Sequence, residues 1–308
     1  MQRTVQVATP SNRTDQLISQ LEPLDDVIGL SVQRGGSIKP VGDVLVINAL
    51  NKGIDEVLRR VADTCRGTNY SIATAEQASM IDQQHDAIIE NDIDEAIWEE
   101  IETGMRQQAH VTVNYMILMA IGGAIATVGL VSDPGPQAVA FVAASVIAPG
   151  FEPLAAIPLG LVLRNSHTVW RGTRSALIGY GVLILAAALT FALLRWTGIT
   201  SEMEFIRNPE VDTLSHPTAK EITVSFCGTL AGAIIIAAYR RSIIAGALIA
   251  MVIIQAAALI GVSVVCARWD LALEGIERFG LDIVFVFVSC FVVFAAKQVL
   301  VHKRKPIV

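Results

Sequence analysis

Long apolar segments occupy the last two thirds of the chain and limit what it can fold into. Each has few charges and about 20 residues or more, which is the length a helix needs to cross a bilayer. The segments lie near residues 114–132, 136–164, 173–196, 219–239, 241–266 and 280–301. Charged residues make up 17% of the chain, below the ~25% of ordinary soluble domains. The sequence therefore predicts a multi-pass membrane protein whose first partner is the lipid bilayer.

The charge balance changes near residue 110. Residues 1–110 carry 9 Lys/Arg and 18 Asp/Glu, whereas residues 111–308 carry 14 and 11. The acidic first part argues against a nucleic-acid partner, because phosphate backbones are held by Lys and Arg. The first ten residues also lack the apolar core of a signal peptide. We therefore expect the acidic part to stay on the cytoplasmic side.

Residues 1–82 are predicted to form a small α+β domain. Strand and helix patterns alternate in the order βαββαβ, which is typical of a ferredoxin-like split sandwich. The expected elements cover residues 4–8, 15–24, 27–32, 43–49, 54–65 and 70–73. Residues 34–37 (RGGS) predict a turn. Such a domain could bind a small ligand or only pair subunits, and the sequence leaves both open.

Residues 83–110 are predicted to form an acidic amphipathic linker helix. Isoleucines recur every fourth residue from Ile89 to Ile101 and form an apolar stripe. Acidic side chains cover the other faces. They predict a solvated surface, with binding of divalent cations as the alternative. Residues 111–308 then form the membrane domain.

Basic residues predict the orientation, because Lys and Arg collect in cytoplasmic loops. With six crossings, one side receives Arg106, Arg164, Arg171, Arg174, Arg240, Arg241, His302, Lys303, Arg304 and Lys305. The other side receives Asp133, an acidic stretch at 200–212 and a loop at 267–279. Six crossings with both termini in the cytoplasm, in the cell (inner) membrane, fit this distribution.

The second apolar segment is predicted to be a broken or re-entrant helix. It contains Pro149, Gly150, Glu152 and Pro153 near its middle. Proline removes a backbone donor and clashes with the preceding turn. Backbone groups freed at that depth must be buried in protein or line a wet cavity. Glu152 is the only acid between Asp133 and Glu202, and an ionisable side chain inside a span indicates a functional site. A boundary residue that reaches the headgroups, or a partner of an Arg, is the alternative.

A weak repeat relates the two halves of the membrane part. Residues 144–172 align with 245–273 at an offset of 101, with Gly160 on Gly261. Spans two and five run in opposite directions if there are six crossings. Spans one to three and four to six then form a 3+3 inverted repeat, a transporter pattern with its site near the midplane. Gln255 lies at a depth in span five that matches the break.

The motif at residues 143–153 (AASVIAPGFEP), followed by Gly160, resembles a bacterial and archaeal membrane family catalogued as domain of unknown function 389. The resemblance covers roughly residues 112–300 and includes a later segment at 246–250 (GALIA). It implies the membrane architecture but no established activity. The chain departs from the family pattern at Glu152, where a small residue is usual, and at Gln255-Ala256, where two prolines are usual.

Two classes of function stay open. The first is a transporter or channel for a small ion or solute, whose site residues are Glu152, Pro149, Gly150, Pro153 and Gln255. The second is a non-transporting membrane scaffold or sensor whose acidic head binds a ligand or partner. An enzyme is not favoured, because neither H-E-x-x-H nor G-x-S-x-G occurs.

The remaining expectations concern partners and caps. No cofactor is predicted, and metal binding is left open. The ferredoxin-like head and the acidic helix favour a homo-oligomer. Asp282, at the start of the sixth span, is expected to cap its helix.

Overall fold

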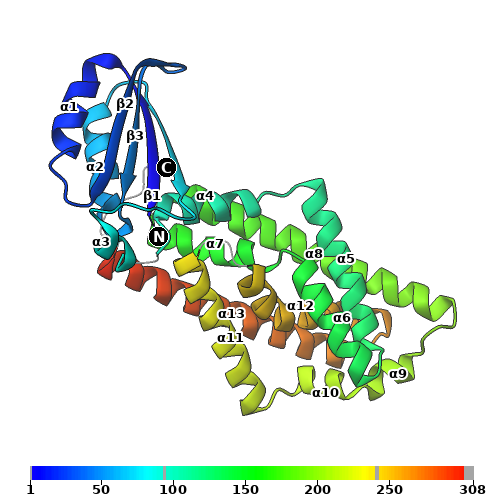
Figure 1. Ribbon diagram of the computed structural model, residues 1–308. Helices are drawn as coiled ribbons and strands as arrows, with labels where there is room; N and C mark the ends of the chain where they lie inside the picture. Colours follow the sequence, from blue (N-terminus) through cyan, green and yellow to red (C-terminus); the bar gives the residue numbers. More distant parts are fainter. Residues whose placement is uncertain (1, 93–94, 240–242, 302–308) are drawn as a thin grey trace. The chain divides into compact units, whose positions relative to one another are not determined.

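The computed structural model describes residues 2–92, 95–239 and 243–301 (Figure 1). The chain divides into two compact units. The first unit extends to residue 100, and the second covers residues 101–301.

The first unit is an antiparallel sheet of four strands with two helices. Its elements are β1 (Arg3–Thr9), α1 (Ser11–Leu21), β2 (Val27–Ile38), β3 (Val41–Ala49), α2 (Ile54–Cys65) and β4 (Ser71–Glu76), with a short 3-10 turn η1 (Asn51–Gly53) before α2. The strands lie in the order β2-β3-β1-β4. The βαββαβ order predicted from the sequence is therefore confirmed.

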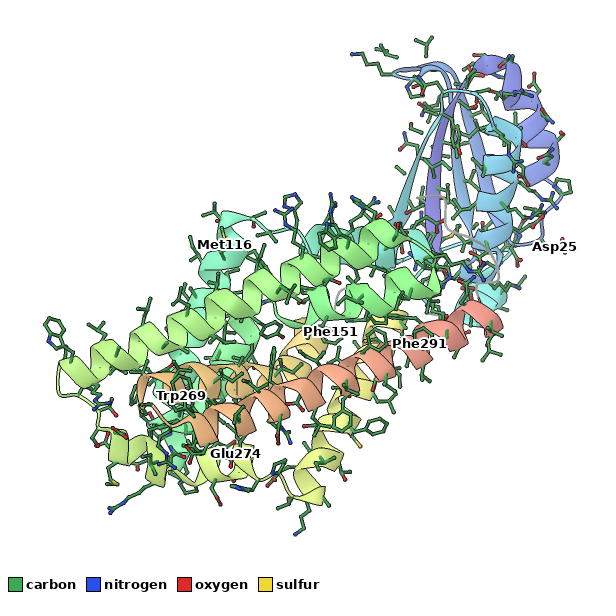
Figure 2. The ribbon with its side chains drawn as sticks, turned by 180° about the vertical axis from the view of Figure 1, so that it is seen from behind. Asp25, Met116, Phe151, Trp269, Glu274 and Phe291 are labelled. Atoms are coloured by element: carbon green, nitrogen blue, oxygen red, sulfur yellow. The ribbon has the colours of Figure 1, made fainter. Side chains whose placement is uncertain are left out.

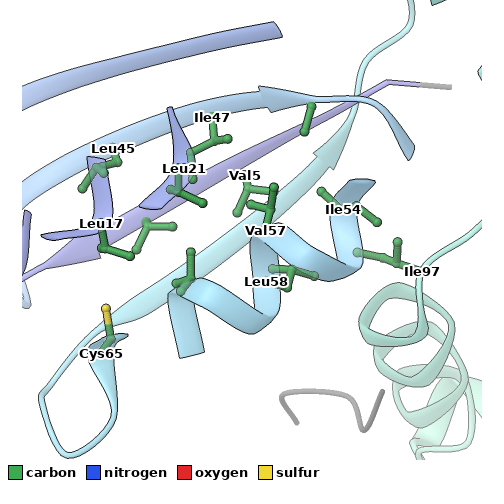
Figure 3. Packing of buried hydrophobic residues seen from close by; sticks show 13 residues of the cluster. Val5, Leu17, Leu21, Leu45, Ile47, Ile54, Val57, Leu58, Cys65 and Ile97 are labelled. Carbon is green, nitrogen blue, oxygen red and sulfur yellow. The ribbon is translucent and has the colours of Figure 1, made fainter. Parts of the chain in front are cut away.

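The core of this unit lies between the sheet and its two helices. Alternate strand residues point inward, because side chains of a strand alternate between its two faces. They meet the apolar faces of α1 and α2, whose buried side chains recur at helical spacing (Figure 3). The cluster contains Val5, Val7, Leu17, Leu21, Leu45, Ile47, Ala49, Ile54, Val57, Leu58, Val61, Cys65 and Ile97.

The prediction of a turn at residues 34–37 is wrong. Strand β2 continues through these residues to Ile38, and its pairing with β3 shifts register between Gln33 and Ser37. Gly35 has a φ of +64°, a conformation that glycine adopts without steric cost. The Gly-Gly signal therefore marks a bulge within the strand.

The acidic segment is not one helix, contrary to the prediction. It forms α3 (Asp86–Glu90) and α4 (Trp98–Gln108). Between them, the carbonyl of Glu95 accepts hydrogen bonds from the side chains of Arg3 and Asn51. Tertiary hydrogen bonds thus replace those of a continuous helix. Glu100 forms a buried ion pair with Arg3 at 2.5 Å, so its carboxylate is not part of a solvated face.

The second unit consists of helices. In chain order they are α5 (Val113–Leu130), α6 (Pro134–Ile147), α7 (Phe151–Val162), α8 (Ser166–Trp196), α9 (Glu202–Arg207), α10 (Pro209–Ser215), α11 (Ala219–Tyr239), α12 (Ile243–Val265) and α13 (Trp269–Leu300). The C-terminal part of α4 also belongs to this unit.

The helices confirm a membrane protein with several candidate spans. Among the described residues, α5, α8, α11 and α13 are long and apolar enough to cross a bilayer, and α6 with α7 forms a bent pair that would be a fifth span. The side chains described in α12 begin at Ile253. The sixth crossing therefore stays a prediction. Arg240, Arg241 and residues 302–305 lie outside the described residues, so the orientation also stays a prediction.

The prediction of a loop at residues 267–279 is wrong, because α13 already begins at Trp269. The helix continues without interruption past Glu274 and Phe291 (Figure 2). Its first turns carry charges, yet they remain helical because they pack against α10, α11 and α12.

Close packing in this unit depends on glycines at helix contacts. A Cβ added to Gly123 of α5, or to Gly261 of α12, would collide with the α8 backbone at Leu183 or Ile184. Small residues allow apolar helices to approach this closely, and such packing drives helix association in bilayers. α8 is thus packed between α5 and α12.

The carboxylate of Asp43 joins β3 to α1 and to the β2 bulge. It accepts hydrogen bonds from the Gly35 N–H at 2.8 Å, Thr14 Oγ1 at 2.7 Å and Ser11 Oγ at 2.8 Å. These bonds lower the pKa of Asp43 from 3.8 to about 2, and the bond from Gly35 has the largest effect. The ionised carboxylate is therefore the form that stabilises the fold.

We predict that Asp43 gives the first unit an acid-dependent stability. Because the folded pKa lies below the unfolded value, its contribution is present above pH ~4 and is lost as the pH falls toward ~2. Amide hydrogen exchange in the full chain, corrected for intrinsic rates, should show protection of β2 and β3 falling in this window. Asp43→Asn should lower protection at neutral pH and remove this component, whereas Asp63→Asn on the surface of α2 should not. Equal profiles for Asp43→Asn and wild type would contradict the assignment.

Candidate site at the broken helix

The second span is interrupted at residues 148–150. α6 ends at Ile147, α7 begins at Phe151 (Figure 2), and the two helices are bent by 48°. Between them, Ala148 is extended, with a ψ of 117°. The predicted break is therefore confirmed.

Two prolines explain the break. Pro149 disfavours a helical conformation at Ala148 and has no N–H to donate. In a continuous helix, the ring of Pro153 would clash with the carbonyl of Pro149 four residues earlier. In the observed structure, Pro153 lies in the first turn of α7, where its missing N–H leaves no helical hydrogen bond unmade.

The hydroxyl of Tyr180, on α8, supplies a partner for the freed backbone. It donates to the carbonyl of Gly150 at 3.0 Å, and the Tyr180 side chain is buried. The N–H of Gly150 donates to the carbonyl of Ala148 at 2.8 Å. A Cβ on Gly150 would lie 2.7 Å from the Tyr180 hydroxyl. This close contact therefore favours glycine at the position.

Glu152 lies in the first turn of α7 and is half-buried. Aligned peptide dipoles favour a negative charge at a helix N-terminus. The carboxylate lies within electrostatic range of the hydroxyls of Tyr115 and Tyr180. Tyr115, on α5, donates to the carbonyl of Ser175 at 2.9 Å. Glu152 thus belongs to a polar group contributed by α5, α7 and α8.

Gln255 lies apart from this group, on α12, and is buried. Helix α12 contacts both α6 and α7. Among the described residues, no hydrogen bond joins Gln255 to Glu152 or to the break. The structure therefore brings together the site residues of the second span and leaves Gln255 on a neighbouring helix.

The turn between α7 and α8 is fixed by Glu102 of α4. Its fully buried carboxylate accepts hydrogen bonds from Asn165 Nδ2 at 2.5 Å and Thr168 Oγ1 at 3.0 Å. Asn165 in turn accepts from two N–H groups in the first turn of α8. The expectation that the acidic face is solvated is wrong at Glu102, because the carboxylate satisfies buried donors at the start of α8.

The turns that follow α7 and α12 have the same backbone geometry. Arg164 and Ala267, which are 103 positions apart, have φ values of 56° and 55°. In each turn the N–H of the next residue donates to the carbonyl five positions before it. Ser166 and Trp269, also 103 positions apart, then begin α8 and α13.

Contacts of the following helices repeat at the same offset. Gly172 of α8 faces Ala156 and Ile157 of α7, and Gly275 of α13 faces the corresponding residues of α12, Leu259 and Ile260. The turn geometry and the glycine contacts therefore recur at an offset of 103 positions, whereas the sequence alignment uses 101. At an offset of 103, the residue that corresponds to Glu152 is Gln255.

The glycines that suggested the shorter offset have different surroundings. A Cβ on Gly160 would meet Val169 and the carbonyl of Asn165, in the turn that follows its own helix. A Cβ on Gly261 would instead meet α8. Their identity reflects two separate close contacts.

Sequence reasoning missed a buried ion pair on α13. Arg278 Nε donates to Asp282 Oδ2 at 3.1 Å, and Arg278 Nη2 donates to Ser225 Oγ of α11 at 2.6 Å. The prediction that Asp282 caps a helix is wrong, because Asp282 lies inside α13. Opposite charges four residues apart beside an apolar segment were the available signal, since this spacing brings them together on a helix.

Residues 145–288 match the family model described as Domain of unknown function (DUF389). This segment is similar to the DUF389 family. It extends from α6 into α13 and contains both the break and the buried ion pair. The resemblance found in residues 143–153 is thus confirmed. No curated protein and no solved structure matches the chain.

We predict that Gly150→Ala destabilises the helical unit. The added methyl group would press on the Tyr180 hydroxyl, and such overpacking costs about 1–3 kcal/mol. Thermal unfolding of the full chain in detergent measures the effect. Gly181→Ala is the matched control, because a Cβ on that glycine of α8 meets nothing within 4 Å. Equal unfolding temperatures for the two variants would contradict the close contact.

Proposed function

We propose that this protein is a transporter or channel for a small ion or solute, with its site at the broken second span. The observation that carries the proposal is the position of Glu152, a half-buried carboxylate in the first turn of α7 beside the break. Ionisable side chains inside spans are costly and mark ion or proton pathways.

The broken backbone supports the same function. In hydrocarbon, irregular backbone is tolerated only where it is buried in protein or lines a water-filled cavity. Here Tyr180 satisfies the carbonyl of Gly150, while Glu152 stands at the N-terminus of the second half-helix. Transporters build midplane sites from such half-helix ends, whose peptide dipoles face the bound solute or ion.

Repeated geometry supports a 3+3 inverted repeat of six spans. In the proposed repeat, α5 corresponds to α11, the bent pair of α6 and α7 corresponds to α12, and α8 corresponds to α13. It relates Glu152 to Gln255 at the offset of 103 that the turns and glycine contacts define. The two site residues would then occupy equivalent levels in the two halves, one as an acid and one as its uncharged amide.

The wider assignment follows from this architecture. We propose a multi-pass protein of the cell (inner) membrane, with both termini in the cytoplasm and assembled as a homo-oligomer. The alternative is a non-transporting scaffold or sensor whose acidic head binds a ligand or partner. The observation that favours this alternative is that the head forms a compact unit with its own core.

Ion flux through the purified protein tests the transport function. The full chain is reconstituted in liposomes, and flux is measured for a panel of small cations and anions over a range of pH. We expect flux of at least one ion, with a pH dependence that Glu152→Gln alters, because the amide cannot bind or release a proton. Glu202→Gln, in α9 outside the spans, is the control and should leave flux unchanged.

Two results would count against this proposal. Absence of flux across the panel would favour the sensor or scaffold. Flux with the same pH dependence in Glu152→Gln would remove Glu152 from the site while leaving transport in place.

A further inference from the structure

The buried ion pair on α13 has features of a binding site. The side chains of Arg278 and Asp282 are only 4% and 1% exposed. They lie within a helix of 32 residues; Arg278 is nine residues from its start, or about 14 Å at 1.5 Å per residue, and Asp282 is one turn further on. Both charges therefore lie inside the apolar unit.

The hydrogen-bonding capacity of this pair is only partly used. Arginine has five N–H donors arranged as a planar fork. The Nε and Nη2 atoms of Arg278 bond to Asp282 and Ser225. Nη1 of Arg278 and Oδ1 of Asp282 are buried and have no hydrogen-bond partner among the described residues. Unpaired buried polar atoms carry a desolvation cost, so these atoms are expected to serve a ligand.

Helix packing alone does not require charged side chains at the positions of Arg278 and Asp282. At the offset of 103, Arg278 and Asp282 correspond to Ser175 and Gly179 of α8. There Tyr115 of α5 fills the space, with its hydroxyl bonded to the carbonyl of Ser175 and in contact with Gly179. The same helix contact is thus made in the first half by one tyrosine against two small residues.

The surroundings of Arg278 add an acidic neighbour. Glu210 of α10 lies within electrostatic range of Arg278 and of Glu221. Burial raises the pKa of Glu210, and the nearby Glu221 raises it further. α10 packs against α13, so this acid comes from a helix next to the one that carries the ion pair.

We propose that Arg278 binds a small oxyanion, such as a carboxylate or phosphate, through the edge of its guanidinium that Asp282 and Ser225 leave free. The inference rests on the proposed transport function and names the substrate class. The planar fork of arginine matches an oxyanion with two parallel hydrogen bonds. Asp282 holds the guanidinium in position and at the same time opposes the anion by like charge.

Two variants change the site in opposite directions. Asp282→Asn keeps the shape of the side chain but removes the competing negative charge, so oxyanion affinity should rise by about tenfold. The triple variant Ser225→Tyr/Arg278→Ser/Asp282→Gly replaces the ion pair by the side chains found at the contact of α5 with α8, a tyrosine against a serine and a glycine. It thereby removes the guanidinium. It should lose specific oxyanion binding while keeping its fold.

Binding is measured on the purified full chain in detergent. Unfolding temperature is followed against acetate, phosphate and chloride at constant ionic strength. Acetate or phosphate should stabilise the wild type above chloride, because a ligand that binds only the folded state raises its stability. Arg195→Gln, which removes an exposed arginine near the end of α8, is the control and should behave like the wild type.

Each outcome decides the proposal. No stabilisation of the wild type by oxyanions over chloride overturns it, as does equal stabilisation in the triple variant. If the triple variant does not fold, the Asp282→Asn arm decides, and unchanged or weaker binding there overturns the proposal. Oxyanion binding that depends on Arg278 without flux in liposomes would refute transport and keep the site. Flux in liposomes without oxyanion binding at Arg278 would support transport and refute the oxyanion site.

Discussion

The hydrogen bond from Tyr180 to the carbonyl of Gly150 is the interaction on which the membrane unit most depends. A bilayer offers no water to a backbone group that leaves its helix, so the break in the second span is possible only if protein supplies a partner. Tyr180 supplies it from α8. This fixes the distance between α7 and α8, which in turn requires Gly150 at the break and Gly172 at the next contact, where side chains would collide.

Local patterns made much of the fold predictable. The βαββαβ order follows from residue alternation and helical spacing, and the break follows from Pro149 and Pro153, whose ring geometry restricts the backbone whatever surrounds it. The linker was predicted less well. Its isoleucine spacing favoured one helix, but Arg3 and Asn51, far away in the sequence, take the carbonyl of Glu95 as a hydrogen-bond acceptor. Tertiary bonds of this kind leave no periodic signal.

The candidate site was predictable only on its own segment. Glu152 was conspicuous because the span around it has no other acid. Its neighbours Tyr115 and Tyr180 come from helices that sequence spacing does not relate to it. The pair of Arg278 and Asp282 was missed because charges reduce hydropathy, so the span was expected to begin near residue 280, after Arg278, with Asp282 as a helix cap. The packing that keeps this stretch helical involves α10, α11 and α12, and no local pattern encodes it.

The two halves of the proposed repeat stabilise their buried polar groups in different ways. In the first half, the backbone is broken and Tyr115 and Tyr180 satisfy carbonyls with neutral hydroxyls. In the second half, the described part of α12 is unbroken, and α13 carries a buried pair of side-chain charges. Removing one member of a buried ion pair is costly, whereas replacing the whole pair by well-packed neutral groups often is not. Since the first half makes the corresponding contact without charges, packing stability alone does not account for Arg278 and Asp282.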